Sequence, residues 1–280
     1  MKKSNLDINT VKSFGSEWSR FPQDKLSEAE AEKIFESYFN VFPLSDLSRD
    51  SVGFDVGCGT GRWAKLLLPR VGHLNCVDPS EALEVAKSNL SGFENVSFFK
   101  ESVDSISLEE NSHDFGYSLG VLHHVPDTEA AIRSCVKLLK PGAPLLLYLY
   151  YDLEGRGVFF TSLWKLSNLF RIIISRMPNF LKMFVCDLLA VTLYLPLSRF
   201  SKFLSWMGFD GKSLPLSFYS DKSFYTIRTD SRDRFGTPLE KRFNRSEIIS
   251  MMKNSNLTKI KFSPLEPYWC VVGYKEESIN

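Results

Sequence analysis

The feature that most constrains the fold is a glycine loop that follows a short apolar run. Residues 54–63 read FDVGCGTGRW, so Gly57, Gly59 and Gly61 alternate with other residues directly after this run. Glycines at a strand-to-helix turn permit positive φ angles and let a ligand approach the backbone, while the following helix presents unpaired N–H groups. The pattern therefore predicts a strand, a ligand-binding turn and a helix.

Short β-rich runs continue to alternate with helix-like stretches beyond this loop. The runs are VGFDVG, HLNCVD, VSFFK, DFGYSLG and PLLLYLYY, and Ser80 and Asp127 are placed to cap the helices between them. Ser27 is a candidate cap for the amphipathic helix SEAEAEKIFESYF that precedes them. This alternation indicates an α/β protein with a doubly wound parallel sheet.

Composition narrows the partners of such a fold. The 280 residues include 34 basic and 33 acidic side chains, a net charge of +1, so we expect no nucleic-acid partner. Five cysteines without a C-x-x-C pair favour a reducing compartment, and four histidines without ligand spacing favour no metal site. The N-terminus MKKSNLDINT lacks the apolar stretch of a secretory signal, so we expect a cytoplasmic protein.

The spacing of the loop discriminates between ligands. A dinucleotide fingerprint needs a glycine where this chain has Arg62, and a phosphate-binding loop needs a K-[ST] pair that is missing here. Asp55, before the loop, would repel a pyrophosphate but can hold a cationic amino group. Asp78 lies about 20 residues further on, where a carboxylate can bind both ribose hydroxyls. The expected ligand is a nucleoside that carries an amino acid, and an NAD-dependent oxidoreductase is the less favoured enzyme class.

Five motifs in order, DVGCGTGRW, VDPS, FFKESVDSI, HDFGYSLGVLHHVPD and LLKPG, resemble those of the class I S-adenosylmethionine-dependent methyltransferases of the small-molecule type. The resemblance covers roughly residues 52–151, and the order and spacing of five motifs make it specific. It implies a Rossmann-like, mostly parallel seven-stranded sheet. It also implies S-adenosyl-L-methionine as methyl donor and S-adenosyl-L-homocysteine as product.

The resemblance further implies a cofactor site at the ends of the first four strands. The loop glycines would line the methionine part, Asp55 would organise the ammonium group, and Asp78 would hold the ribose. The complete set of candidate cofactor-binding residues is Trp18, Asp55, Gly57, Cys58, Gly59, Gly61, Asp78, Pro79, Ser102, Val103, Leu119, Gly120 and Val121.

Other members of this set would meet the adenine and the sulfonium. Pro79, Ser102 and Val103 would lie beside the adenine, and residues 119–121 would flank the sulfonium. Ser102 departs from the commoner aspartate at this position, and a hydroxyl is a weaker acceptor for the adenine amino group. Trp18 would close over the cofactor or pack in the core. Cys58 is counted with the loop, and its thiol is expected to be a small packing group.

A general base is needed only if the methyl acceptor loses a proton. His124 is the first candidate, followed by His123, Tyr151 and Asp152, which all lie just beyond the fourth and fifth strands. The histidines can equally be a hydrogen-bonded pair at the start of a helix.

The chain departs from the sheet pattern after Tyr151. We expect an N-terminal helical segment (1–50), a cofactor-binding core (51–152), an apolar helical insert or lid after the fifth strand (153–212), and a C-terminal part (213–280) that resumes with the strand SFYTIRT. The insert's longest apolar run, LLAVTLYLPL, is half of the roughly 20 residues of a transmembrane helix, so we expect no span.

Apolar side chains of the insert require a cover. The residues expected to be buried are Phe159, Phe160, Trp164, Phe170, Phe184, Leu188 and Leu195. The substrate pocket, a second subunit in a homodimer or a membrane interface can each cover them. A cap over the sheet is favoured, because basic residues are spread through the segment and Asp187 interrupts its longest apolar stretch. Peripheral membrane contact through the insert is the alternative.

The resulting expectation is a methyltransferase that acts on a small-molecule, lipid-linked or saccharide-linked acceptor. The alternative is a non-catalytic protein that binds S-adenosylmethionine and uses the insert for partner or membrane contact. Arg232 and Arg234 would either clamp an anionic acceptor or pair with Asp230, Asp233 or Glu240, and pairing is favoured.

Overall fold

The chain, described by a computed structural model, forms two compact units. The structure describes residues 4–20, 27–152, 157–211, 214–265 and 269–277. The core unit comprises Met1–Asp24, Ala31–Gly155 and Leu239–Asn280, and the insert unit comprises Lys25–Glu30 and Arg156–Pro238. The insert unit therefore continues well past residue 212, where the sequence pattern placed its end.

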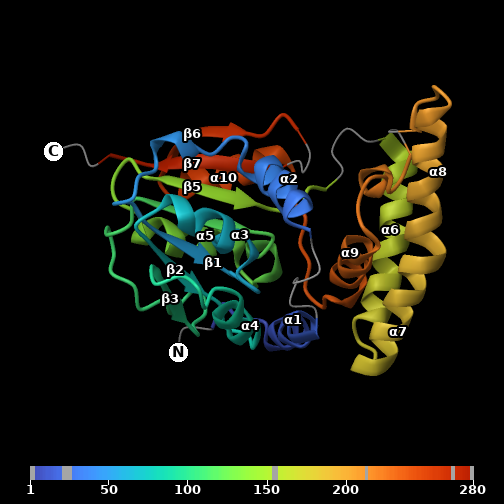
Figure 1. Cartoon of the computed structure of the whole chain (residues 1–280), viewed down its shortest axis with the longest axis horizontal. Coiled ribbons are helices and arrows are strands. Elements are labelled where there is room, and N and C mark those ends of the chain that lie inside the picture. Colours follow the sequence, from blue (N-terminus) through green and yellow to red (C-terminus); the bar gives the residue numbers. More distant parts are fainter. Residues whose placement is uncertain (1–3, 21–26, 153–156, 212–213, 266–268, 278–280) are drawn as a thin grey trace. The chain divides into compact units, whose positions relative to one another are not determined.

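A seven-stranded sheet is the centre of the core unit (Figure 1). Its strands are β1 (Val52–Val56), β2 (His73–Val77), β3 (Val96–Phe99), β4 (Phe115–Leu119), β5 (Pro144–Tyr148), β6 (Leu257–Phe262) and β7 (Cys270–Lys275). Their order is β3-β2-β1-β4-β5-β7-β6, with β7 antiparallel to both neighbours and the others parallel. The predicted mostly parallel, seven-stranded sheet is confirmed.

Two glycine–phenylalanine pairs fix the spacing between β1 and β4. A Cβ at Gly53 would lie 2.1 Å from the Phe115 ring, and a Cβ at Gly116 would lie 2.1 Å from the Phe54 ring. Each ring therefore lies directly over the glycine of the neighbouring strand, and both phenylalanines are fully buried. This packing sets β1 and β4 side by side, so that the loops leaving their carboxyl ends meet.

Helices of the core unit begin where the sequence places caps. They are α1 (Ile8–Arg20), α2 (Glu28–Phe39), α3 (Arg62–Leu67), α4 (Ala82–Asn89), α5 (Thr128–Leu138) and α10 (Arg245–Asn254). The part of α2 that belongs to the core unit begins at Ala31. The predicted caps Ser27 and Asp127 accept hydrogen bonds from the third backbone N–H beyond them, and Ser80 accepts one from the N–H of Ala82. Asn244 forms a capping box at α10.

The described part of the insert unit consists of helices joined by turns and loops. It contains α6 (Gly157–Ile174), α7 (Asn179–Leu189), a π-helical turn (Ala190–Tyr194), α8 (Leu195–Trp206) and α9 (Phe224–Gly236), and α9 packs against α6 and α7 (Figure 1). The prediction of a strand at SFYTIRT is wrong, because Ser223 caps a helix there by accepting the N–H of Thr226.

One helix of the insert unit is longer than predicted from the apolar run LLAVTLYLPL. The helix is continuous over Asn179–Trp206, 28 residues, and its length and composition meet those of a membrane span. The expectation based on the short LLAVTLYLPL run is therefore wrong about length, because the helix continues on both sides of that run.

The predicted burial of the insert's aromatic side chains is also wrong for several of them. Phe170, Phe184 and Leu188 are 51%, 64% and 49% exposed, whereas Trp164 and Leu195 are half-buried. The side chains of Phe159 and Phe160 lie outside the described part of the chain. The role of a lid stays a prediction.

Candidate active site

The three glycines of the loop serve three different physical purposes. All have positive φ angles, of 79°, 54° and 76° at Gly57, Gly59 and Gly61. A Cβ at Gly57 would lie 2.4 Å from the Val121 side chain, and one at Gly61 would lie 2.8 Å from Leu90 on α4. A Cβ at Gly59 would meet nothing closer than 4.0 Å. Gly57 and Gly61 are therefore packing glycines, and Gly59 leaves its backbone open to a ligand.

Asp55 is a buried carboxyl group directly below this loop. It lies on β1, is 1% exposed, and its Oδ2 atom has no hydrogen-bond partner among the described residues. Burial raises the pKa of Asp55 to about 8, and the charge of Asp78 raises it too, while Tyr117 and Arg62 lower it. The group is ready to ionise if a cation binds beside it, because a nearby positive charge favours the carboxylate.

Asp78, at the end of β2, holds the turn to the glycine loop. Its Oδ2 accepts the backbone N–H of Gly59 at 2.9 Å, and its Oδ1 accepts the N–H and hydroxyl of Ser80 at 2.8 and 2.6 Å. A carboxylate offers about four lone-pair sites, so Asp78 keeps acceptor capacity for ribose hydroxyls. Pro79, which separates Asp78 from Ser80 in the sequence, is partly exposed.

The thiol of Cys58 behaves as the sequence argument expected. Cys58 is 4% exposed, and its contact with Cys76 together with burial raises the pKa of its thiol above the ordinary range. It therefore packs as a neutral group beneath the loop.

Helix α1 lies beside the same loop. The Nε1 atom of Trp18 lies 4.0 Å from the position of a Cβ at Gly59, and a Cβ at Gly15 would lie 3.2 Å from the backbone nitrogen of Glu81. Helix α1 therefore lies next to the glycine loop and the start of α4. This is the position from which an N-terminal helix could close over a cofactor. Whether Trp18 covers a cofactor stays a prediction.

Beyond β3, the chain supplies a carboxylate that the sequence argument missed. Ser102 donates its hydroxyl to Asp104, and Asp104 also accepts the backbone N–H of Asn5 at 2.7 Å. Asn5 in turn exchanges two hydrogen bonds with the backbone of Asp127. Val103 points into the core and is 7% exposed. The spacing alone gave no sign that Asn5 links these two loops.

The end of β4 meets the glycine loop. Leu119 is nearly buried, Gly120 has a φ of 78° and donates its N–H to the Tyr148 carbonyl, and Val121 packs against Gly57. The residues predicted to flank the sulfonium are therefore brought next to those predicted to line the methionine part.

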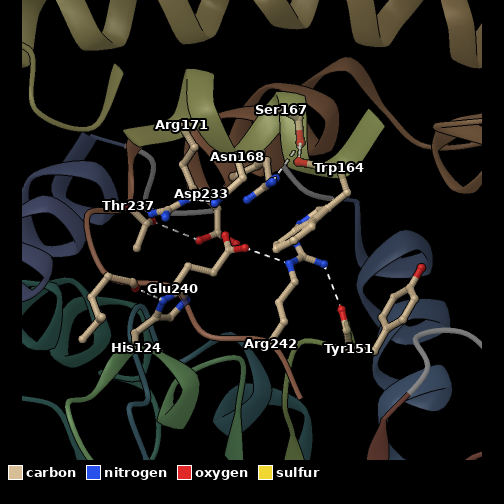
Figure 2. A network of polar contacts seen from close by, with 12 residues as sticks. His124, Tyr151, Trp164, Ser167, Asn168, Arg171, Asp233, Thr237, Glu240 and Arg242 are labelled. Atoms are coloured by element: carbon tan, nitrogen blue, oxygen red, sulfur yellow. Dashed lines mark hydrogen bonds and ion pairs between the residues drawn. The ribbon is translucent and has the colours of Figure 1, made fainter. Parts of the chain in front are cut away.

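The two histidines that follow are buried and differ in their hydrogen bonds. The Nδ1 atom of His124 lies 2.6 Å from the carbonyl oxygen of Leu239 (Figure 2). A carbonyl only accepts, so Nδ1 carries the proton, and in the neutral ring Nε2 carries the lone pair. Neither ring nitrogen of His123 has a hydrogen-bond partner among the described residues. Burial, then the charges of His124 and Arg242, hold the pKa of His123 well below its ordinary value.

Aromatic rings surround this pair. Tyr150 stacks on His123 with ring centroids 3.8 Å apart, and Phe14 lies 5.0 Å from His124. Tyr148 lies 5.7 Å from Tyr150. The structure thus places Tyr150 where Tyr151 was expected, because successive side chains of an extended segment point to opposite sides.

Tyr151 and Asp152 take part in a different set of contacts. Tyr151 packs against Trp269, and its carbonyl oxygen accepts from Arg242 at 3.1 Å (Figure 2). Arg242 also pairs with the nearly buried Glu240 at 2.9 Å. The backbone of Asp152 donates to Phe243. The sequence suggested Glu240 as a partner of Arg232 or Arg234, and it did not indicate Arg242.

The residues of the core unit fit S-adenosylmethionine. The buried carboxyl group of Asp55 suits an ammonium group, the backbone at Gly59 suits close approach of a ligand, and Asp78 suits the ribose. A dinucleotide fits less well, because a carboxylate at Asp55 would repel its pyrophosphate.

Comparison with known proteins identifies a methyltransferase domain in the core unit. Residues 54–147 match the family model of the methyltransferase domain. The ubiquinone biosynthesis O-methyltransferase of Xanthomonas oryzae pv. oryzae is 35% identical over 97 residues, 33% of this chain and 40% of that protein. The protein of the same name from Marinobacter nauticus is 30% identical over 161 residues, 52% of this chain and 64% of that protein. The chain therefore matches less than two thirds of the length of these relatives.

Solved structures share the fold. A Methanococcus maripaludis protein described as an S-adenosyl-L-methionine-dependent methyltransferase aligns with a TM-score of 0.54 at 12% identity, covering 99% of this chain and 98% of its own. A Bacillus halodurans protein described as a methyltransferase gives a TM-score of 0.51 at 13% identity, with 81% and 70% covered. Residues 54–147 are therefore a methyltransferase domain, and the core unit has the Rossmann-like fold of these solved methyltransferase structures.

Proposed function

We propose that this protein transfers a methyl group from S-adenosylmethionine to a hydroxyl group of a small-molecule, lipid-linked or saccharide-linked acceptor. The observation that carries the proposal is the hydrogen bond from His124 Nδ1 to the Leu239 carbonyl, which leaves Nε2 as the proton acceptor. The named relatives are O-methyltransferases, which supports a hydroxyl acceptor.

The bound cofactor would supply an activated methyl group on its sulfonium. Asp55 would hold the ammonium group of the cofactor, and Asp78 would hold its ribose. The backbone at Gly59 would let the cofactor approach closely. His124 Nε2 would take the proton that the acceptor hydroxyl loses, and the Leu239 carbonyl would stabilise the resulting imidazolium through Nδ1–H. The base needs no metal ion for this step.

The rings around the histidines support a planar, apolar acceptor. Phe14, Tyr148 and Tyr150 offer ring faces and edges to a planar group. His123 stays neutral because it is buried, so it offers one donor and one acceptor to a second polar group of the acceptor. In this assignment His124 is the catalytic base, and His123 is a recognition residue.

The proposal is tested by incubating the protein with S-adenosylmethionine and a panel of water-soluble and prenylated phenols and catechols, and by measuring the S-adenosylhomocysteine that forms. We expect turnover with at least one of them, and a fall in kcat of about 10² to 10⁴ in His124→Ala with little change in S-adenosylhomocysteine affinity. His73→Ala is the matched control, because His73 hydrogen-bonds Ser97 at the amino-terminal end of β2. Full turnover in His124→Ala would remove the base from the mechanism.

A second outcome would favour a different class of function. If the protein binds S-adenosylhomocysteine tightly but methylates no member of the panel or of a total lipid extract, the non-catalytic binding protein becomes the better account.

A further inference from the structure

The insert unit exposes nearly all the large apolar side chains that the chain leaves in contact with solvent. Among the described residues 21 such side chains are exposed, and only Ile8 and Leu265 lie in the core unit, which leaves 19 in the insert unit. The most exposed are Phe180 at 77% and Trp206 at 81%, near the two ends of the helix Asn179–Trp206. A soluble monomer rarely leaves so large an apolar surface uncovered.

Several charged side chains are buried within the same unit. Arg232 on α9 is 3% exposed, and it and Arg228 bind both carboxylate oxygens of Asp187 on α7. Arg171 is 6% exposed and donates to the carbonyls of Thr237 and Pro238 (Figure 2). Asp187 is thus a partner of Arg232 that the sequence did not indicate, and pairing with Asp230, Asp233 or Glu240 stays a prediction. These charged groups lie beside a small apolar core, while many large apolar side chains of the unit stay exposed. The core consists of Ile174, Cys186, Ala190, Tyr194, Ile227 and Phe235.

The helical segment of the insert unit also has a net positive charge. Residues 156–238 contain 12 lysines and arginines and 5 aspartates, a net charge of +7. The remaining residues contain 22 basic and 28 acidic side chains, a net charge of −6. Exposed cations lie within the apolar stripes, as Lys165 between Leu163 and Leu166 shows. A surface that is both apolar and cationic matches an anionic lipid interface.

The polar side of the insert unit determines how it can meet a bilayer. The helix Asn179–Trp206 is long enough to span, but Lys182, Asp187 and Ser198 lie on its inward side and contact or approach polar groups. Helix α9, which packs on it, carries five charged residues between Arg228 and Arg234. Spanning would place α9 in hydrocarbon, where each charge is costly. Only an orientation in the plane of the interface immerses the apolar side alone.

We propose that the insert unit docks on an anionic bilayer surface, with the exposed apolar sides of α6, α7 and α8 in the interface. A second copy of the chain is a poorer occupant, because a two-fold contact pairs the same patch with itself and so brings exposed cations such as Lys165 and Arg176 near their own copies. The docking goes beyond the proposed methyl transfer and does not depend on it.

Vesicle flotation of the full chain tests the docking. The probes are vesicles of phosphatidylcholine alone and of phosphatidylcholine with about 30% phosphatidylglycerol. We expect flotation with the anionic vesicles, reversal by about 0.5 M salt, and little flotation with the neutral ones.

Two pairs of variants separate the apolar and cationic contributions. Phe180→Ser with Trp206→Ser should lower the partition coefficient at least tenfold. Ile8→Ser with Leu265→Ser, which removes two exposed apolar groups from the core unit, should leave it within about twofold. Lys165→Glu with Arg176→Glu should weaken binding to anionic vesicles only, and Lys65→Glu with Lys253→Glu is its matched control. Circular dichroism verifies that each variant folds.

The proposal is overturned if the wild-type chain ignores anionic vesicles, or if the core-unit controls lose as much binding as the insert variants. A dimer in light scattering that dissociates in Phe180→Ser with Trp206→Ser, together with absent flotation, would assign the surface to a second copy instead.

Discussion

Gly57 and Gly59 are two residues apart, yet the structure predicts opposite consequences of replacing them with alanine. At Gly57 the new methyl group would lie 2.8 Å from Cβ of Val121, which no rotamer change can move, and the φ of 79° is strained for alanine. Left-handed backbone costs about 1–2 kcal/mol and overpacking about 1–3 kcal/mol, so Gly57→Ala should lose about 2–5 kcal/mol of stability. Gly59→Ala bears only the backbone cost of about 1–2 kcal/mol, because its methyl group enters open space.

The same open space is where the cofactor should approach the backbone. Gly59→Ala should therefore weaken S-adenosylhomocysteine binding at least tenfold, about 1.4 kcal/mol, while remaining the more stable of the two variants. Urea unfolding measures stability, and titration calorimetry measures the dissociation constant. The reasoning is refuted if Gly59→Ala is as destabilised as Gly57→Ala, or if it binds S-adenosylhomocysteine as tightly as the unaltered protein.

Three further changes address the carboxylates. Because burial raises the pKa of Asp55 to about 8, the folded chain keeps a proton that the unfolded chain releases near pH 4, so stability should fall as pH rises between these values, and Asp55→Asn should flatten this fall in urea titrations at several pH values. The same variant should abolish the proton release on S-adenosylhomocysteine binding near pH 7, measured by calorimetry in two buffers of different ionisation enthalpy. Asp78→Ala should weaken S-adenosylhomocysteine binding at least tenfold without creating NAD binding, and an unchanged affinity would count against the ribose assignment. Asp187→Ala leaves Arg232 buried without its carboxylate, so it should cost about 3–5 kcal/mol of stability by urea unfolding, and a loss below about 1 kcal/mol would contradict the importance of the pair.

Local spacing in the sequence was sufficient to predict the first half of the core unit. The glycine loop, Asp55 and Asp78 depend on neighbours within a few residues or on the repeat of one strand and one helix, so their relative positions follow from chain geometry. The caps Ser27 and Asp127 were predictable for the same reason, since each bonds a backbone group three residues ahead.

Contacts between distant segments were beyond that kind of reasoning. Asn5 bonds Asp127 across 122 residues, and His124 bonds the Leu239 carbonyl across 115 residues, so neither leaves a periodic signal. Tyr150 contacts His123, whereas Tyr151 contacts Trp269, because the two side chains point to opposite sides of an extended segment. The sequence does not show which of the two sides faces the histidines. The short run SFYTIRT has strand-like composition, but its cap and its packing on α7 make it helical.

The sequence by itself determined the composition of the insert unit, including its aromatic content, its basic residues and the interruption at Asp187. Only the tertiary structure decided which of these groups face inward. Arg228 and Arg232 converge on Asp187 at the contact of α7 with α9, beside the small apolar core of the unit. Phe180, Phe184 and Trp206 are left outside, because a helix has two sides and the paired charges occupy the one that α9 covers.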